Sequence, residues 1–239
     1  KIIKSIKTKA TIKKKGVYIE GDYSEYNKDS EIIKLEKNVL FKDRTKKITV
    51  ETENAKYNQK LDILETIGST NIKIEKKYEI ESSNLIFDRK LQKIYSSQET
   101  TIKDINGNIY NLERYFNFDL NKEIITSKKT NIIDVDNNIY IFDNAKINLL
   151  NKEILGQEVR IDFVDDYFGV PNNDPILKGR SAISNNNETK IYKTVFSTCN
   201  TTNKSCPGWE IETEEFTHDK VNKVFNYKNS WLKLFDQEI

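Results

Sequence analysis

The sequence predicts an all-β fold in which long, bent antiparallel strands form a folded-over sheet built from repeated units. The first observation behind this prediction is a repeat. An aromatic or aliphatic residue followed by Asn or Asp recurs five times, at a near-constant spacing of about 30 residues. The five copies are Tyr26-Asn27, Tyr57-Asn58, Phe87-Asp88, Phe118-Asp119 and Ile147-Asn148.

Each copy is followed by two further apolar positions, which is the second observation. An isoleucine comes five or six residues after the Asn or Asp, at Ile33, Ile63, Ile94, Ile124 and Ile154. A second apolar point comes later, at Val39, Ile72, Ile102, Ile132 and Val159. Because one such unit cannot bury its apolar face alone, the repeat indicates stacked units that share one continuous core.

The N-terminal stretch Lys1–Lys15 is basic and alternates between lysine and apolar or small residues. We interpret it as an edge strand with its lysines facing solvent, an arrangement that discourages uncontrolled edge pairing. The alternative is a basic patch that contacts phosphate groups.

Between Gly16 and Phe163 the sequence alternates between strand-like and turn-like segments. Within strands, apolar residues two apart share one face, as with Ile48 and Val50 or Ile139 and Ile141. Turn signals separate the strands, and Asn106-Gly107 is the strongest hairpin signal among them. The expected turns are Lys28-Asp29-Ser30, Asp43-Arg44, Gln59-Lys60, Arg89-Lys90, Asn106-Gly107, Asn121-Lys122, Asp136-Asn137-Asn138 and Asn151-Lys152.

The predicted strands are too long for an ordinary sheet, which is the third observation. Leu61–Lys76 would run roughly 50 Å if it were fully extended, and a strand of that length is expected to bend and serve two layers. Small or polar residues lie where bends are needed, at Gly68-Ser69, Ser96-Ser97 and Ser127. We therefore expect a sheet folded over an apolar interior, open along one side.

The C-terminal third departs from the repeat. Asp165–Glu188 contains Pro171, Pro175, Gly169 and Gly179, and we expect a long loop there. Strands resume at Lys190, and a final hairpin forms around Asp219-Lys220. The expected organisation is therefore a repeat region over 1–163, a loop or linker over 164–189, and C-terminal strands of the same jellyroll over 190–239.

Composition excludes several functional classes. Lys+Arg number 39 and Asp+Glu 37, so the basic excess of a dedicated nucleic-acid-binding protein is missing. One His and 2 Cys argue against a clustered metal site. The hydrophobic fraction of 36% is low, which suits either partial disorder or thin sheets with one solvated face. No apolar run approaches the ~18 residues of a membrane helix. No signal peptide is visible at Lys1, and we expect the sequence to begin and end inside a longer protein.

The C-terminal region resembles a known family. The segments "NNDPILKGRSA", "VFSTC", "CPGW", "EEFTHDK" and "VFNYKNSWLKLF" are similar to the end of the periplasmic domain of LptD (OstA), the outer-membrane lipopolysaccharide-assembly proteins. The preceding repeat resembles the OstA-like β-jellyroll that this family shares with the periplasmic bridge proteins of the same pathway. Together the two resemblances cover nearly the whole chain.

The resemblance implies lipopolysaccharide transport at the periplasmic side of a Gram-negative outer membrane, with an apolar groove passing acyl chains toward a β-barrel. The implied partners are lipopolysaccharide, a homologous bridge jellyroll, a barrel expected after Ile239 in the same chain, and its lipoprotein plug. No cofactor and no catalytic residue are implied. Cys199 matches a family cysteine that joins this domain to the barrel by a disulfide. Cys206 departs from the simplest family pattern, so pairing of Cys199 with Cys206 or with the barrel stays open.

The candidate groove residues occupy the second apolar point of the repeats. They are Val39, Phe41, Ile72, Ile74, Ile102, Ile132 and Val159. Without the resemblance, a closed and fully packed core that binds no ligand is the simpler interpretation. The alternative functional class is a structural or adhesive β-repeat, or a carbohydrate-active one. An enzyme of that kind should place carboxylates together at one repeat position, whereas acidic residues here are scattered over outward positions.

Three further features favour structural interpretations. His218-Asp219 could be a general base with its orienting acid, but neighbours on a strand point to opposite faces, which favours a turn-flanking pair. Asp165-Asp166 could be a metal or acid/base pair, although a solvated loop is the simpler interpretation. Trp209 is expected to be a packing anchor beside the cysteine-containing loop.

Overall fold

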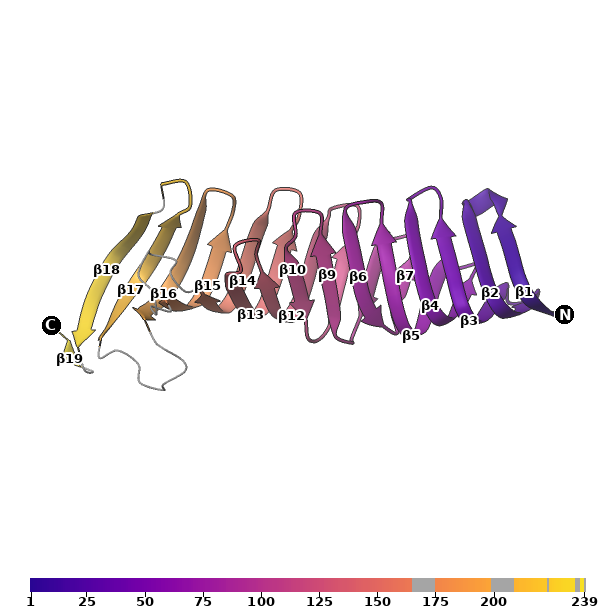
Figure 1. Cartoon of the computed structure of the whole chain (residues 1–239), viewed down its shortest axis with the longest axis horizontal. Helices are drawn as coiled ribbons and strands as arrows, with labels where there is room; N and C mark the ends of the chain where they lie inside the picture. Colours follow the sequence, from indigo (N-terminus) through magenta and orange to yellow (C-terminus); the bar gives the residue numbers. More distant parts are fainter. Residues whose placement is uncertain (165–174, 199–208, 223, 235–236, 239) are drawn as a thin grey trace. The chain divides into compact units, whose positions relative to one another are not determined.

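The computed structural model describes residues 1–164, 175–198, 209–222, 224–234 and 237–238. The described elements are antiparallel strands, apart from a single 3-10 turn at Lys13–Lys15 (Figure 1). The prediction of an all-β, jellyroll-like fold is therefore confirmed. The chain divides into two compact units, residues 1–121 (unit 1) and 122–239 (unit 2).

Unit 1 consists of long strands followed by short ones. The long strands are β1 (Ile2–Ile12), β2 (Val17–Asn27), β3 (Ile32–Asp43), β4 (Ile48–Asn58) and β5 (Ile63–Ile74). The short strands are β6 (Tyr78–Ser83), β7 (Ile86–Asp88), β8 (Lys93–Ser96), β9 (Thr100–Asp104), β10 (Ile109–Leu112) and β11 (Phe116–Asp119).

The bend in β5 divides the sheet of unit 1 into two layers. Residues 69–74 of β5 pair with β6, whereas residues 63–65 pair with β7. Between them Gly68 adopts a φ of +86°, in the left-handed region that glycine occupies without steric cost. Beyond β5, strands β6, β9 and β10 continue one layer, here called layer A. Strands β7, β8 and β11 continue the other, called layer B, so the expected bend at Gly68-Ser69 is confirmed.

The repeated Asn or Asp caps the turn that follows it. The side-chain Oδ1 of Asn58 accepts a hydrogen bond from the Leu61 N–H, and that of Asp88 accepts one from the Leu91 N–H. Asn27, Asp119 and Asn148 cap their turns in the same way. The preceding residue of the motif is buried in four of the five copies, at Tyr57, Phe87, Phe118 and Ile147. Each copy thus joins a core anchor to a capped turn.

A second capping motif lies at the opposite ends of the strands and was not anticipated from the sequence. Asp104 accepts hydrogen bonds from the Asn108 side chain at 2.8 Å and the Tyr110 hydroxyl at 3.1 Å. Asp134 accepts the equivalent bonds from Asn138 and Tyr140 at 3.0 and 3.1 Å. The shared pattern, Asp followed by Asn and Tyr at fixed offsets, is visible in the sequence.

Unit 2 is also built from long bent strands. They are β12 (Ile124–Ile133), β13 (Ile139–Asn148), β14 (Glu153–Asp162), β15 (Pro175–Ser184), β16 (Glu188–Thr198), β17 (Trp209–Asp219) and β18 (Val224–Leu234), followed by the short β19 (Gln237–Glu238). Positive φ values at Lys129, Glu158 and Lys193 mark bends near the middle of β12, β14 and β16. The final hairpin around Asp219-Lys220 forms as predicted.

Strand β15 corrects the expected loop over 164–189. It alternates in burial and pairs with both β14 and β16. Pro175 opens the strand, where its missing N–H costs little. Gly179 packs so closely against Ile191 that a Cβ there would lie 2.2 Å from the Ile191 Cγ2 atom. Pro175 and Gly179 were therefore misleading as loop signals, and residues 165–174 of the expected loop lie outside the described ranges. The expected domain boundaries at 163/164 and 189/190 stay predictions, while the compact units divide at 121/122.

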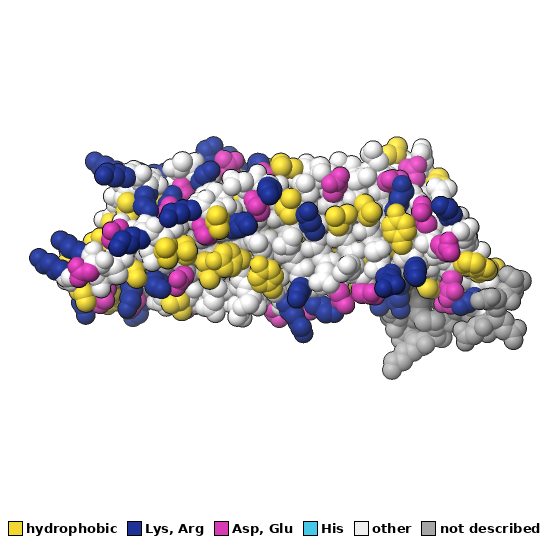
Figure 2. Space-filling view, turned by 180° about the vertical axis from the view of Figure 1, so that it is seen from behind, with side chains coloured by type: hydrophobic (Ala, Val, Ile, Leu, Met, Phe, Trp, Pro, Cys, Tyr) yellow, Lys and Arg dark blue, Asp and Glu magenta, His cyan; other side chains and the backbone are white. Residues whose placement is uncertain are grey.

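The outer surface is mixed in charge. Figure 2 shows basic and acidic side chains interspersed with small apolar groups on the face that it displays. Many of the exposed charges are paired across strands, as in Lys9–Glu20 and Lys56–Glu65. Within the described ranges, no helix is long and apolar enough to cross a membrane.

Candidate functional site

The interior of unit 1 is built from rows of apolar residues that run across its strands. In each row the residues are direct cross-strand partners. The row of layer A consists of Ile19, Phe41, Val50, Ile72, Ile80, Ile102 and Tyr110. The main row of layer B consists of Ile33, Tyr57, Leu64, Phe87, Ile94 and Phe118. Every member of both rows is buried.

The structure brings three groove candidates into one row. Phe41, Ile72 and Ile102 all belong to the layer A row, and each has an exposed fraction of 0%. Val39 and Ile74 lie in neighbouring rows of the same layer and are also buried. All five therefore point into unit 1, although a contact with lipid remains a prediction for each.

The remaining two candidates belong to unit 2. Ile132 pairs with Tyr140 and is buried, as is Val159, which pairs with Gly179. The groove candidates are thus inward-facing in both units, but they do not form one cluster.

The two layers of unit 1 are in direct contact. The rings of Phe41 in layer A and Tyr57 in layer B meet edge to face, with centroids 5.2 Å apart. Tyr78 and Phe118 make a second such contact at 5.5 Å. Apolar side chains lower their free energy by excluding water in this way. The interior of unit 1 is consequently packed along these contacts.

A cluster of charges bridges the two layers at their turns, on the side that the sequence predicted to be open. Arg89, in the β7–β8 turn of layer B, contacts Asp43 at the end of β3 in layer A, with Nη2 2.8 Å from Oδ2. It also contacts Asp62 in the β4–β5 turn at 2.7 Å. The Arg89 guanidinium further donates to the Lys15 carbonyl at 2.9 Å and to the Tyr57 hydroxyl at 3.3 Å.

Lys15 completes this group, which we call the seam cluster: Lys15, Asp43, Tyr57, Asp62 and Arg89. The Lys15 ammonium belongs to the β1–β2 turn of layer A and lies 3.4 Å from the Asp62 carboxylate in layer B. The side chain of Asp43 is fully buried, and that of Arg89 has an exposed fraction of 7%. Two cations thus face two carboxylates, so the seam cluster has no net charge.

Mutual interactions favour the charged forms of Asp62 and Arg89 in the seam cluster. Burial acts to raise the pKa of Asp62, but hydrogen bonds from Tyr57 and Arg89 outweigh it and hold that pKa below its ordinary value. Burial acts to lower the pKa of Arg89, yet its contacts with Asp43 and Asp62 raise it overall. Burial and the neighbouring Asp62 raise the pKa of Tyr57. The carboxylate of Asp62 is therefore charged at neutral pH.

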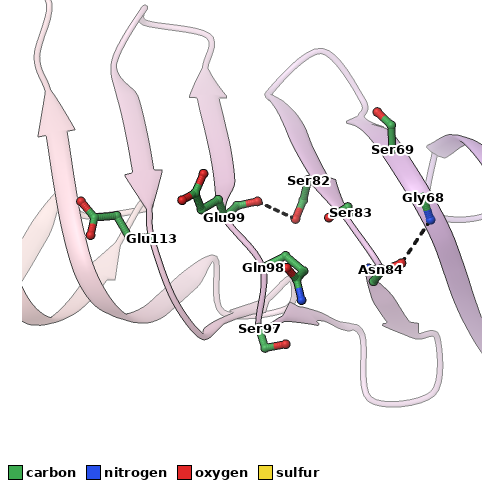
Figure 3. Close-up of a pocket in the computed structure, with 9 residues that line it drawn as sticks. All are labelled: Gly68, Ser69, Ser82, Ser83, Asn84, Ser97, Gln98, Glu99 and Glu113. Atoms are coloured by element: carbon green, nitrogen blue, oxygen red, sulfur yellow. Dashed lines mark hydrogen bonds between the residues drawn. The ribbon is translucent and has the colours of Figure 1, made fainter.

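A polar hollow lies at the bend of unit 1, where β5, β6 and β7 diverge (Figure 3). Two of its polar side chains are bound to the protein itself, since Ser82 donates to the Glu99 carbonyl and Asn84 accepts from the Gly68 N–H. The lining residues are Gly68, Ser69, Ser82, Ser83, Asn84, Ser97, Gln98, Glu99 and Glu113. Over the described part of the chain, no group of three or more His, Cys, Asp or Glu residues is arranged to hold a metal ion.

The interior of unit 2 is aromatic toward its last long strands. Phe216 contacts Phe225 and Tyr227 edge to face, with centroids 4.9 and 5.4 Å apart. Phe196 packs against Trp209 at 6.1 Å, in agreement with the expected anchoring role of this tryptophan. On β18, Trp231 and Leu232 remain exposed. Cys199, Cys206 and the Asp165-Asp166 pair lie outside the described residues.

His218 and Asp219 do not form an acid/base pair. The His218 ring is buried and stands perpendicular to Phe225, with centroids 4.9 Å apart. Asp219 instead caps the β17–β18 turn, accepting hydrogen bonds from the Val221 and Asn222 N–H groups. The turn-flanking interpretation agrees with this geometry.

Burial of His218 makes the stability of unit 2 dependent on pH. Burial, assisted by the charge of Lys220 and opposed by Asp219, lowers the pKa of His218 to about 4. Between pH 6.5 and 4 the unfolded chain therefore binds a proton that the folded chain does not. We expect the free energy of unfolding to fall by about 1–2 kcal/mol between pH 7.5 and 5.

Urea titrations at the two pH values measure this change. The matched variant His218→Phe keeps an aromatic ring but cannot titrate, and its free energy of unfolding should change much less over the same range. An equal loss in both proteins would show that other groups cause the pH dependence.

Comparison with known families relates unit 1 to one of them. Residues 8–117 match the family model described as lipopolysaccharide-assembly, LptC-related. The match runs from within β1 into β11, and it covers the seam cluster, the layer A row and all of the layer B row except Phe118. A search of curated proteins found no match.

The LptC-related match supports the bridge families of lipopolysaccharide transport and does not single out LptD. It lies within unit 1, and unit 2 contains the segments on which the resemblance to LptD rests. The match agrees with the coarser expectation, a jellyroll related to lipopolysaccharide assembly, over residues 8–117.

Proposed function

We propose that this chain binds the acyl chains of lipopolysaccharide in its apolar interior and passes them along a periplasmic transport path. The observation that carries the proposal is the row of buried apolar residues across layer A of unit 1, within the LptC-related segment. With strands about 4.8 Å apart, the row from Ile19 to Tyr110 runs roughly 30 Å. The tails of one bilayer leaflet span about 15 Å, so an apolar row of that length can cover an extended tail and leave it room to move along the row.

Lipid transfer through water needs such a surface. Burying one CH₂ group of a lipid tail away from water lowers the free energy by about 0.8 kcal/mol. A tail in transit must therefore stay covered by apolar side chains, without one site that binds it so tightly that it cannot leave. The layer A row offers aliphatic and aromatic side chains of similar character from strand to strand, which suits movement along it.

The edge strand β1 supports a role in a chain of jellyrolls. It pairs with β2, and its residues Thr8, Ala10 and Ile12 are half-buried at the edge of the apolar interior. Strand addition by another jellyroll would satisfy the free backbone groups of β1 and extend the apolar rows into the partner. We therefore propose a homologous bridge jellyroll as the partner at this edge.

The finer assignment is a position next to the outer membrane, as the periplasmic part of an LptD-like protein. It rests on the resemblance of the C-terminal segments, and it includes a barrel with its lipoprotein plug as the receiving partners. In that assignment Cys199 forms a disulfide with the barrel, and the exposed apolar side chains of β18 face the next carrier of the lipid.

The alternative, a carbohydrate-active β-repeat, receives less support. The polar hollow at the bend is the feature that favours it, because it gathers serine hydroxyls and two exposed carboxylates. The Ser82 hydroxyl is already engaged with the Glu99 carbonyl and the Thr100 hydroxyl, and Glu99 and Glu113 do not share a position in the repeat. We propose no enzymatic activity for this chain.

Competition binding separates the two functions. Labelled lipopolysaccharide is bound to the purified protein and displaced either by lipid A or by the isolated polysaccharide portion. We expect lipid A to displace the label completely and the polysaccharide to leave it bound, because the apolar interior recognises tails. The reverse result would move the binding site to the polar hollow and overturn the proposal.

A further inference from the structure

The seam cluster joins the two layers of unit 1 at their turns, on the side of the folded sheet opposite the bend. Arg89 and Asp62 belong to turns of layer B, whereas Lys15 and Asp43 belong to turns of layer A. The sequence predicted that this side of the folded sheet would be open. In the structure it is crossed by charge-assisted hydrogen bonds, which are shorter and stronger than neutral ones.

Next to the seam cluster, aromatic side chains of the two layers also lie in contact and leave no free path for a lipid tail between them. Phe41 lies two residues before Asp43 and touches Tyr57, whose hydroxyl bonds to the Asp62 carboxylate. Tyr57 therefore connects the packed interior to the seam cluster. A lipid tail that entered here would have to part these rings, and doing so would pull Asp62 and Arg89 away from Asp43.

We propose that the seam cluster is a latch that holds the two layers of unit 1 together and that must open for a tail to enter the interior from the side. The role of the latch in lipid entry rests on the proposed lipid-binding function. The contact between the two layers does not, and it can be tested on the protein without lipid. A buried cation among two carboxylates is suited to such a switch. Separating the layers exposes all the charges to water at once, so the open state is hydrated rather than left with a lone buried charge.

Thiol labelling measures the opening directly, without any lipid. In a background with Cys199→Ser and Cys206→Ser, single cysteines replace Ile48, beside the seam, or Leu85, at the bend. Both positions are buried in the folded protein, with exposed fractions of 2% and 0%. We expect Arg89→Gln to speed labelling at the Ile48 position by about tenfold or more and to leave the Leu85 position within about twofold.

The matched control is Lys90→Gln, in the same turn. It removes the same charge, but the Lys90 ammonium lies at the exposed surface, where it donates a hydrogen bond to the Lys60 carbonyl. Its labelling rates should equal those of the parent at both positions. The double variant Asp43→Asn with Arg89→Gln repeats the test without leaving a single charge buried, in case Arg89→Gln alone fails to fold. Unchanged labelling beside the seam, or equal acceleration at both positions, would overturn the latch.

Uptake of a fluorescent fatty acid, cis-parinaric acid, tests the purpose of the latch in the same variants. Faster uptake by Arg89→Gln, together with faster labelling beside the seam, supports both proposals. Faster labelling with no uptake by any variant would leave the latch standing and contradict lipid binding. Uptake by the parent with no change in labelling would leave lipid binding standing and contradict the latch.

Discussion

Replacing Ala10 by lysine is expected to abolish association with a bridge jellyroll while leaving the fold of this chain intact. Ala10 is a half-buried residue of the edge strand β1 and the direct cross-strand partner of Ile19, the first residue of the layer A row. An inward-pointing lysine on an edge strand is a device by which natural sheets prevent edge-to-edge pairing. In a continuous stack, its ammonium would have to enter the shared apolar interior.

The control is Thr11→Lys, on the next residue. Thr11 is exposed and faces outward, so its replacement adds the same charge to the same strand without entering the interior. Binding to a bridge jellyroll of the same pathway, measured by surface plasmon resonance, should weaken by at least about 100-fold for Ala10→Lys and change little for Thr11→Lys. Equal binding by both variants would show that the partner docks on another surface.

The repeat predicted much of this fold because its signals are local. The Asn or Asp of each copy makes hydrogen bonds to backbone groups two or three residues away, and its apolar neighbour is buried in four of the five copies. The bend at Gly68 was predictable because a long strand needs one and glycine tolerates a positive φ. These features depend on short stretches of sequence, and they are correct.

Strand β15 and the seam cluster were missed because they depend on distant partners. In the sequence, Pro175 and Gly179 are typical loop residues. Only the close contact of Gly179 with Ile191 of the neighbouring strand explains why a glycine is needed there. Arg89 lies 46 residues from Asp43, and no periodicity joins them. One signal was available, since Asp43 continues the inward alternation of Val39 and Phe41. A carboxylate at an inward position requires a buried partner, and the arginine in the repeat turn was the candidate.

The placement of lipid in the interior of unit 1 is the central claim, and site-specific photo-crosslinking tests it most directly. A photoreactive amino acid is placed at Ile72 or Ile102, which are buried in the layer A row, and at the adjacent Lys73 or Lys103, which are exposed. Because successive residues of a strand point to opposite faces, each pair samples the inside and the outside at nearly the same place.

After irradiation in cells that export lipopolysaccharide, adducts are detected with an antibody to it, and circular dichroism of the purified variants confirms that each is folded. The account predicts adducts at positions 72 and 102 and none at positions 73 and 103. Equal capture at all four positions, or capture at the lysine positions alone, would contradict it.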